Sequence, residues 1–227
     1  MVAVTVLQYL LQVVSMVMVG HLDELSLFGV SVTTSFTSVT GFSLLFGMAG
    51  ALETLCEQAY GAEQYQKLGT YTCTAIVSLI LVCLSISVLW IFTDKLLILI
   101  GQDPSISKVA KKYSIWLIPN FFSYAVLQAL IRYFQTQSLI LPMFFSSFVT
   151  LCFHISFCWD LVFKVELGCV CSALAISLSY WLNVIMLGLY MKYSSQCAKT
   201  RSVILKDALV SMREFLSFRC SFCSNDL

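Results

Sequence analysis

Residues 40–62, TGFSLLFGMAGALETLCEQAYGA, decide the fold, because they begin as an apolar membrane span and end in a polar, glycine-containing segment. No residue from Thr40 to Leu52 is charged. Small residues recur every fourth position along this span, with Val39 as the one larger member: Ser31, Ser35, Ser43, Gly47 and Ala51. In a helix this spacing forms a smooth stripe that lets a neighbouring helix approach closely in lipid. We therefore expect a packed bundle, with the stripe against a helix of the same lobe or against a second lobe.

Two carboxylates follow this apolar stretch, one helical turn apart. They are Glu53 and Glu57, and Gln58 comes directly after them. An ionisable residue at the edge of a span suggests a role in transport. A carboxylate at this depth can equally reach headgroups or water. Both interpretations stay open, and Glu53 and Gln58 are candidates for a substrate or proton path.

The composition places the chain in a membrane. Of its 227 residues, 59% are hydrophobic and only 11% are charged. A soluble domain has about 25% charged residues, so this chain could not cover itself with a polar surface. Long apolar runs with three prolines favour helices over the alternating pattern of a membrane barrel. The net charge of +1, with no basic face, argues against nucleic acid as a partner.

The apolar runs predict an all-α integral membrane fold, a six-transmembrane-helix bundle over residues 1–191. The expected spans are at about 1–19, 27–55, 69–92, 113–133, 141–163 and 167–191. An amphipathic cytoplasmic connector is expected at 192–216, whereas residues 217–227 have no helical pattern. Eight of the thirteen Lys and Arg residues fall on the side of the two termini, which predicts that both termini are cytoplasmic.

Cysteine usage predicts neither a metal site nor a cofactor. Most of the ten cysteines lie inside apolar runs, where a cysteine behaves as a small hydrophobe. Cys220 and Cys223 form a single CxxC pair without a second pair or a nearby histidine.

Three more polar residues within the spans are candidates for a substrate or proton path. Asn120 follows Pro119, which removes a backbone hydrogen bond and kinks the helix, as at a hinge or a binding cavity. His154 shares a helical face with Ser147 and could serve in a proton relay, or could be a structural histidine bonded to a neighbouring hydroxyl or carbonyl. Asn183 lies in the inner half of the last span.

Several stretches, in order along the chain from about Val4 to Leu216, carry a family resemblance. They are MVGHLDELSLFGVSV, TSVTGFSLLFGMAGALETLCEQAYGAEQY, GQDPSI, LIRYFQTQSLILPM, CWDLVFK, LGCVCSALAISLSYWLNVIMLGLY and KYSSQCAKT. The chain thereby resembles the multidrug and toxic compound extrusion (MATE) transporters, specifically the plant DETOXIFICATION branch. The resemblance implies a multi-pass protein of the plasma or vacuolar membrane that exports organic compounds, commonly cationic or phenolic, in exchange for protons. It also implies a fold of two six-helix lobes that face each other across a central cavity.

At the end of the second span, family members read LCGQAYGA. The residues that match this motif are Leu55, Cys56, Gln58, Ala59, Tyr60 and Gly61. Glu57 replaces a glycine, so a charge stands where we expect a close-packed backbone.

The resemblance covers the first lobe alone. We therefore expect a truncated or alternative isoform, with a complementary second lobe as a possible partner. In plant members the acidic residues thought to carry protons lie in the second lobe. Residues 1–19 also lack the aspartate that bacterial relatives use. The resemblance therefore assigns no proton-carrying residue to this chain.

Three functions compete. The first is proton-coupled antiport of organic compounds, with the bilayer, protons and a small organic substrate as partners, although this chain by itself is expected to be incomplete. The second is a non-transporting membrane subunit or isoform that assembles with a complete transporter. The third, a membrane-embedded enzyme using His154, Asp160 or a cysteine, is disfavoured because no nucleophile is paired with a base.

Overall fold

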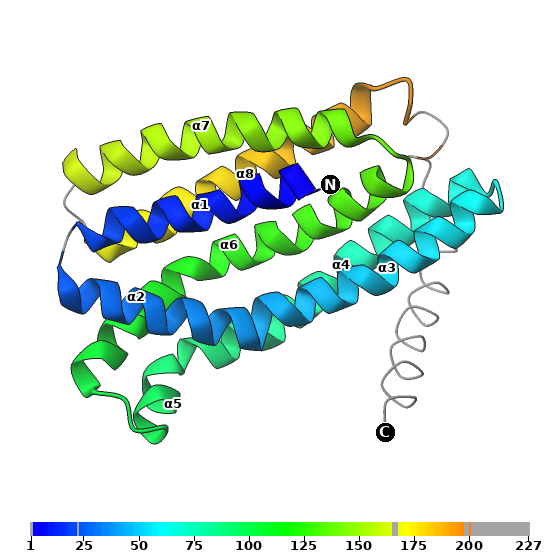
Figure 1. Ribbon diagram of the computed structural model, residues 1–227. Helices are drawn as coiled ribbons and strands as arrows, with labels where there is room; N and C mark the ends of the chain where they lie inside the picture. The colour runs from blue at the N-terminus through cyan, green and yellow to red at the C-terminus, as the bar shows by residue number, and fades with distance from the viewer. Residues whose placement is uncertain (1, 22, 165–167, 198–199, 201–227) are drawn as a thin grey trace.

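The computed structural model describes residues 2–21, 23–164, 168–197 and 200, and the described part is almost entirely helical (Figure 1). Six helical stretches are long and apolar enough to cross a membrane, which confirms the predicted all-α fold. The elements are α1 (Val2–Gly20), α2 (Glu24–Thr37), the π-helical η1 (Ser38–Phe42), α3 (Ser43–Gly61), α4 (Tyr65–Ile91), α5 (Thr93–Leu99), α6 (Pro104–Thr136), α7 (Ile140–Lys164) and α8 (Cys169–Tyr193).

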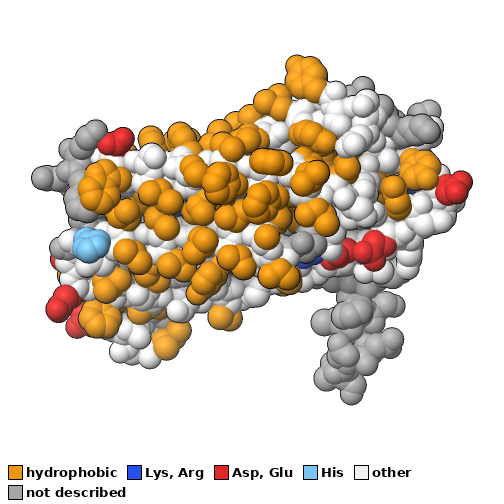
Figure 2. Space-filling view, turned by 45° about the horizontal axis from the view of Figure 1, so that its top comes forward, with side chains coloured by type: hydrophobic (Ala, Val, Ile, Leu, Met, Phe, Trp, Pro, Cys, Tyr) orange, Lys and Arg blue, Asp and Glu red, His pale blue; other side chains and the backbone are white. Residues whose placement is uncertain are grey.

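The spans lie side by side and alternate in direction, with α6 at the centre (Figure 1). On one side of α6 lie α1, α7 and α8, and on the other lie the continuous α2–η1–α3 span and α4. Figure 2 shows apolar side chains across the middle of one face, with Asp and Glu gathered at its two ends. This distribution is the one that a bilayer imposes on a bundle that crosses it.

The second span is longer than the sequence predicts and contains a π-helical turn. The helix runs without a break from Glu24 to Gly61, past the expected end at Leu55. Asp23 caps its start, because its carboxylate accepts a hydrogen bond from the Ser26 amide at 3.1 Å. In the middle, the Ser43 amide donates to the Ser38 carbonyl five residues back, which widens the turn.

The closely packed face of this span is not the predicted stripe. Its small and hydroxyl residues are Gly29, Thr33, Thr37 and Gly41, all of them buried. A Cβ atom on Gly29 would lie 2.6 Å from Val109 Cγ1, and one on Gly41 would lie 2.6 Å from Trp90 Cζ2, so only glycine fits at either position.

The middle of the predicted stripe points outwards from the lobe. Val39 is 76% exposed, and a Cβ on Gly47 would meet no atom within 4 Å. Of the two partners expected for this stripe, a helix of the same lobe is therefore not the one that its middle contacts. The two sets of residues are offset by two positions, or about 200° around a helix.

The connection between the third and fourth spans holds the short helix α5. The next helix, α6, begins at Pro104, whose fixed backbone angle suits the first turn of a helix. Asp103 caps α6 by accepting a hydrogen bond from the Ser105 amide at 2.7 Å. Lys111 on α6 pairs with Asp94 on α5 at 3.0 Å, and this hydrogen bond holds the pKa of the Asp94 carboxyl below its usual value.

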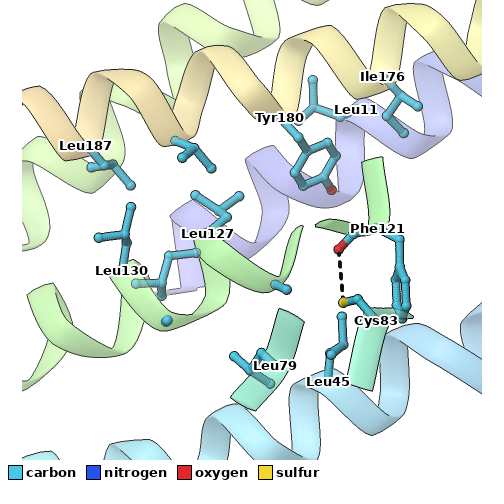
Figure 3. Close-up of a cluster of buried hydrophobic side chains, with 14 of the residues drawn as sticks. Leu11, Leu45, Leu79, Cys83, Phe121, Leu127, Leu130, Ile176, Tyr180 and Leu187 are labelled. Carbon is cyan, nitrogen blue, oxygen red and sulfur yellow. Dashed lines mark hydrogen bonds between the residues drawn. The ribbon is translucent and has the colours of Figure 1, made fainter. Parts of the chain in front are cut away.

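Figure 3 shows the core on both sides of α6. Leu45, Leu79 and Cys83 of α3 and α4 lie on one side, with the Cys83 thiol 3.8 Å from the Phe121 carbonyl oxygen. Leu127 and Leu130 of α6 lie on the side of α8 (Figure 3). The described cysteines are all free thiols, and Cys83 and most of the others are buried among apolar side chains.

Most of the predicted connector at 192–216, and all of residues 217–227, lie outside the described residues. The described part of the connector forms hydrogen bonds with residues at the end of α6. The Tyr133 hydroxyl lies 2.6 Å from the Thr200 hydroxyl, which also donates to the side-chain oxygen of Gln137 at 2.9 Å.

A methyl group at Gly41 tests the close approach of the second span to Trp90. Gly41→Ala is expected to cost about 1–3 kcal/mol of stability, because the new methyl overpacks a full interface. The purified chain in detergent should unfold at a lower temperature. Gly47→Ala is the matched control, since its methyl enters open space and alanine favours a helix by up to about 1 kcal/mol. Equal melting temperatures for the two variants would contradict this packing.

Candidate functional site

A cavity of about 320 Å³ lies between α1, α2, η1, α6 and α8. This volume is at the lower end of the range for small-molecule pockets, about 300–1,000 Å³. Its wall combines apolar and aromatic side chains with hydroxyl and amide groups, among them Gln12, Ser15, Thr34, Ser38 and Asn120. None of the described residues that line it has a charged side chain.

Asn120 lines this cavity and carries a buried amide oxygen without a partner. Its side chain is 2% exposed, and its Oδ1 atom has no hydrogen-bond partner among the described residues. Leaving a buried acceptor unpaired costs about 1–3 kcal/mol. A bound molecule that donates a hydrogen bond to Asn120 would recover this free energy.

An aromatic wall closes the cavity on the side of η1. Phe42 lies at the end of the π turn and lines the cavity. Its ring centroid is 4.9 Å from that of Tyr124 and 5.5 Å from that of Phe121, both edge-on. Trp90 supports the same cluster and donates its indole N–H to the Thr40 hydroxyl at 3.2 Å. The π turn thereby fixes one aromatic face of the cavity.

His154 lies behind the cavity wall, fully buried between α1, α7 and α8. Its Nε2 atom is 3.0 Å from the Ser15 hydroxyl, and its Nδ1 atom is 2.9 Å from the Ser179 hydroxyl. These bonds are those of the predicted structural histidine. Because Ser15 also lines the cavity, His154 is one side chain away from any bound molecule.

Glu53 lies in a separate cluster with Arg132 and Gln135. Arg132 Nη1 is 2.8 Å from one carboxylate oxygen of Glu53, and the Gln135 side-chain amide donates to the other. The guanidinium also lies over the Phe46 ring, 5.1 Å from its centroid. Arg132 is twelve residues beyond Asn120 on α6, about 18 Å along the helix, so Glu53 does not belong to the cavity.

A protein-family comparison decides what kind of membrane protein carries this cavity. The MatE family model matches residues 1–159, more than half of the chain. The chain belongs to the MatE family. It is therefore a multi-pass protein of a transporter family rather than an enzyme, as the sequence predicts.

Individual MatE relatives match almost all of this chain. It is 54% identical to Protein DETOXIFICATION 7 of Arabidopsis thaliana over 217 residues, which cover 96% of this chain and 43% of the relative. It is 55% identical to Protein DETOXIFICATION 14 of Arabidopsis thaliana over 218 residues, 96% of this chain and 45% of that protein. The crystal structure of the eukaryotic MATE transporter AtDTX14 superposes with a TM-score of 0.92 at 55% identity, over 95% of this chain and 48% of that chain. The chain thus spans about half the length of the relatives that it matches.

The other predicted site residues of this MatE chain lie outside the cavity. Gln58 is exposed near the end of α3, together with Glu57 and Tyr60. The carboxylate of Glu57 therefore intrudes on no packed backbone in this lobe, contrary to the sequence-based expectation. Asn183 is buried on α8, and its Oδ1 has no partner among the described residues, but it does not line the cavity.

The remaining motif positions of this MatE lobe also lie on α3, outside the cavity. Cys56 and Ala59 are buried, Leu55 is half-buried, and Gly61 ends α3. In the described part of the chain, no three His, Cys, Asp or Glu side chains come together as a metal site would need.

Sequence reasoning missed Ser15 of the cavity and Arg132 of the ion pair. Ser15 has a signal in the sequence, because Gln8, Gln12 and Ser15 follow helical spacing within an otherwise apolar span. Arg132 lies at the edge of its span, where a basic residue is ordinary, so nothing local marks it as the partner of Glu53.

The ion pair can be tested by removing one charge. Glu53→Gln leaves the Arg132 guanidinium without its counter-charge, and we expect a loss of about 1–3 kcal/mol. The expected cost is below the about 3–5 kcal/mol of a fully buried pair, because the Glu53 side chain is 23% exposed. Thermal unfolding of the purified chain in detergent measures it.

Glu57→Gln, one turn further on the same helix, is the matched control for this change. The residue is exposed, so the expected effect is within about 0.5 kcal/mol. If the two glutamine variants unfold at the same temperature, the Glu53–Arg132 pair does not stabilise the lobe.

Proposed function

We propose that this chain forms the substrate-binding N-terminal lobe of a proton-coupled antiporter that exports organic compounds, and that the cavity is part of the substrate path. Membership of the MatE family supports export as the general activity. The observation that carries the proposal is an uncharged, partly aromatic cavity whose wall includes Asn120, a buried amide with an unpartnered Oδ1. Pockets of this kind take small organic molecules and orient them with a few polar groups.

The wall of the cavity favours one class of organic compound. Phe42 and Tyr113 offer aromatic faces, and Asn120 needs a hydrogen-bond donor. No carboxylate lines the described wall, so an organic cation would be desolvated there without a counter-charge, at high cost. We therefore propose a neutral aromatic compound with a hydroxyl group, such as a phenol, as the ligand of this lobe.

His154 is the group that we propose responds to protons. It reaches the cavity through the Ser15 hydroxyl. Glu53, the other ionisable candidate of the sequence analysis, is held in its ion pair with Arg132 about 18 Å away along α6, so we do not assign it to the proton path. Gln58 and Asn183 are likewise left out of the proposed path, because neither lines the cavity.

A transporter of the relatives' length requires another half that moves against this lobe. Alternating access is the rocking of two repeats around a site near the middle of the bilayer. Tyr9 and Val17 line the cavity on α1 and are 65% and 55% exposed, so the cavity opens beside them. We propose that the other half covers this opening.

Binding of 2-naphthol, a fluorescent neutral phenol, to the purified chain in lipid nanodiscs tests the cavity. Asn120→Leu removes the free acceptor, and we expect the affinity to fall by about 3- to 10-fold, the value of one hydrogen bond. The melting temperature should not fall, because leucine replaces an unpaired polar group.

Asn183→Leu is the control for the naphthol experiment. It removes an equally buried, equally unpartnered amide oxygen that does not line the cavity, so the affinity should be unchanged. Naphthol binding that is equally strong in the parent chain and in Asn120→Leu would refute the proposed site.

The 227-residue chain alone is expected to bind substrate but not to pump it. Gradient-driven transport needs two halves that rock against each other, and this chain spans about half the length of its relatives. Liposomes that contain the purified chain should show no movement of naphthol under an imposed pH gradient beyond that of empty liposomes. Movement that disappears when the gradient is collapsed would show that this lobe transports without another half.

A further inference from the structure

The hydrogen atoms around His154 can be counted. The Ser179 hydroxyl donates to the Ala175 carbonyl at 2.7 Å, so its single hydrogen is already used. Ser179 can therefore only accept from the imidazole, and the hydrogen of the neutral ring must be on Nδ1. Nε2 is then an acceptor, and the Ser15 hydroxyl donates to it at 3.0 Å. In this state the Ser15 hydroxyl oxygen can still accept a hydrogen bond, and Ser15 lines the cavity.

Protonation of His154 would reverse the direction of the Ser15 bond. An imidazolium has a hydrogen on each nitrogen and accepts none. Carbonyl oxygens of the two neighbouring helices lie close enough to accept from it, that of Leu11 on α1 and that of Ala175 on α8. Whether Nε2 donates to Leu11 or to the Ser15 oxygen, the hydrogen of Ser15 loses its acceptor. The acceptors then within its reach are the Leu11 carbonyl, four residues back on α1, and a molecule in the cavity that Ser15 borders.

We propose that Ser15 is the residue that couples protonation of His154 to ligand binding, because it offers the cavity an acceptor when His154 is neutral and a donor when His154 is protonated. When His154 is neutral, a phenol donates its hydroxyl hydrogen to Ser15. When His154 is protonated, the Ser15 hydroxyl is itself a donor, so it competes with the phenol hydroxyl instead of accepting from it. Proton uptake would thus weaken binding of the exported compound, which is the order of events that antiport requires. This inference rests on the proposed function for the identity of the ligand, but not for the hydrogen-bond reversal.

The elements around His154 carry few groups that could respond to protons in its place. Close to His154 along α7 are the thiols of Cys152 and Cys158, and α8 carries Cys171 and Tyr180 near Ala175 and Ser179. Cys158 and Cys171 pack in a cluster of their own. The described part of α1 carries Tyr9 as its one titratable side chain. No ion pair to His154 is found among the described residues.

Nuclear magnetic resonance of the imidazole nitrogens tests the reversal without a ligand. The chain has two histidines, so His21→Gln leaves His154 as the sole source of signal. At neutral pH, ¹⁵N-histidine spectra of the chain in nanodiscs should show the Nδ1–H form. Ser15→Ala should move the Nε2 resonance, whereas Ser87→Ala, a buried serine on α4 that bonds its own helix, should leave it in place. The Nε2–H form, an Nε2 resonance that Ser15→Ala does not move, or no titration of His154 between about pH 4.5 and 8 would overturn the inference.

Naphthol binding across the same pH range tests the consequence. The affinity of the chain and of Ser87→Ala should fall about 3- to 10-fold as His154 becomes protonated, and should not change with pH in Ser15→Ala or His154→Gln. Binding that ignores pH while His154 titrates would overturn the role of Ser15 and leave the proposed binding site intact. Absence of naphthol binding at every pH would contradict the proposed function instead, and the imidazole spectra would then decide the hydrogen-bond reversal alone.

Discussion

The contact of the Gly41 backbone with the rings of Trp90 and Phe121 is the constraint on which the rest of this lobe depends. It sets the distance of the second span from α4 and α6, because any side chain at position 41 would overlap both rings. Residues four apart drift by about 40° per step around an α-helix, so a long stripe with that spacing would leave the interface. A π turn holds more residues per turn and offsets part of this drift. The turn at Ser38–Phe42 therefore lets Gly29, at one end, and Leu45, at the other, both face the bundle.

The number and type of the spans could be predicted from the sequence, but the face that packs could not. The thickness of the bilayer fixes how long an apolar helix must be, so composition alone indicates six helices. Small residues recur at a spacing of four on two faces of the second span, one through Ser35 and Gly47 and one through Gly29 and Gly41. Nothing local distinguishes these faces. The choice is made by Trp90 and Phe121, which are about 50 and 80 residues away in the chain.

The residues of the candidate site were predictable only where a polar side chain cannot form its hydrogen bonds within its own helix. Asn120 and His154 are conspicuous in apolar spans because an amide or imidazole there needs a partner from elsewhere. A serine does not stand out, since its hydroxyl commonly bonds the carbonyl four residues back, and a sequence cannot show whether it does. The role of Glu53 depends on Arg132, whose distance along the chain hides the pairing.

The hydrogen bonds that serine and threonine form within their own helices explain why protonation of His154 would affect the cavity rather than the opposite helix. Thr40 and Ser87 donate to the backbone carbonyls four residues back, so their hydrogens are already used within their own helices. Ser179 is committed in the same way to Ala175. Ser15 instead bonds the imidazole, and in the Nδ1–H form proposed above its hydrogen is the one that protonation of the ring would displace. Of the two hydroxyls that hold His154, only the one on the cavity wall can therefore change direction, and this asymmetry gives the buried histidine a path to a bound molecule.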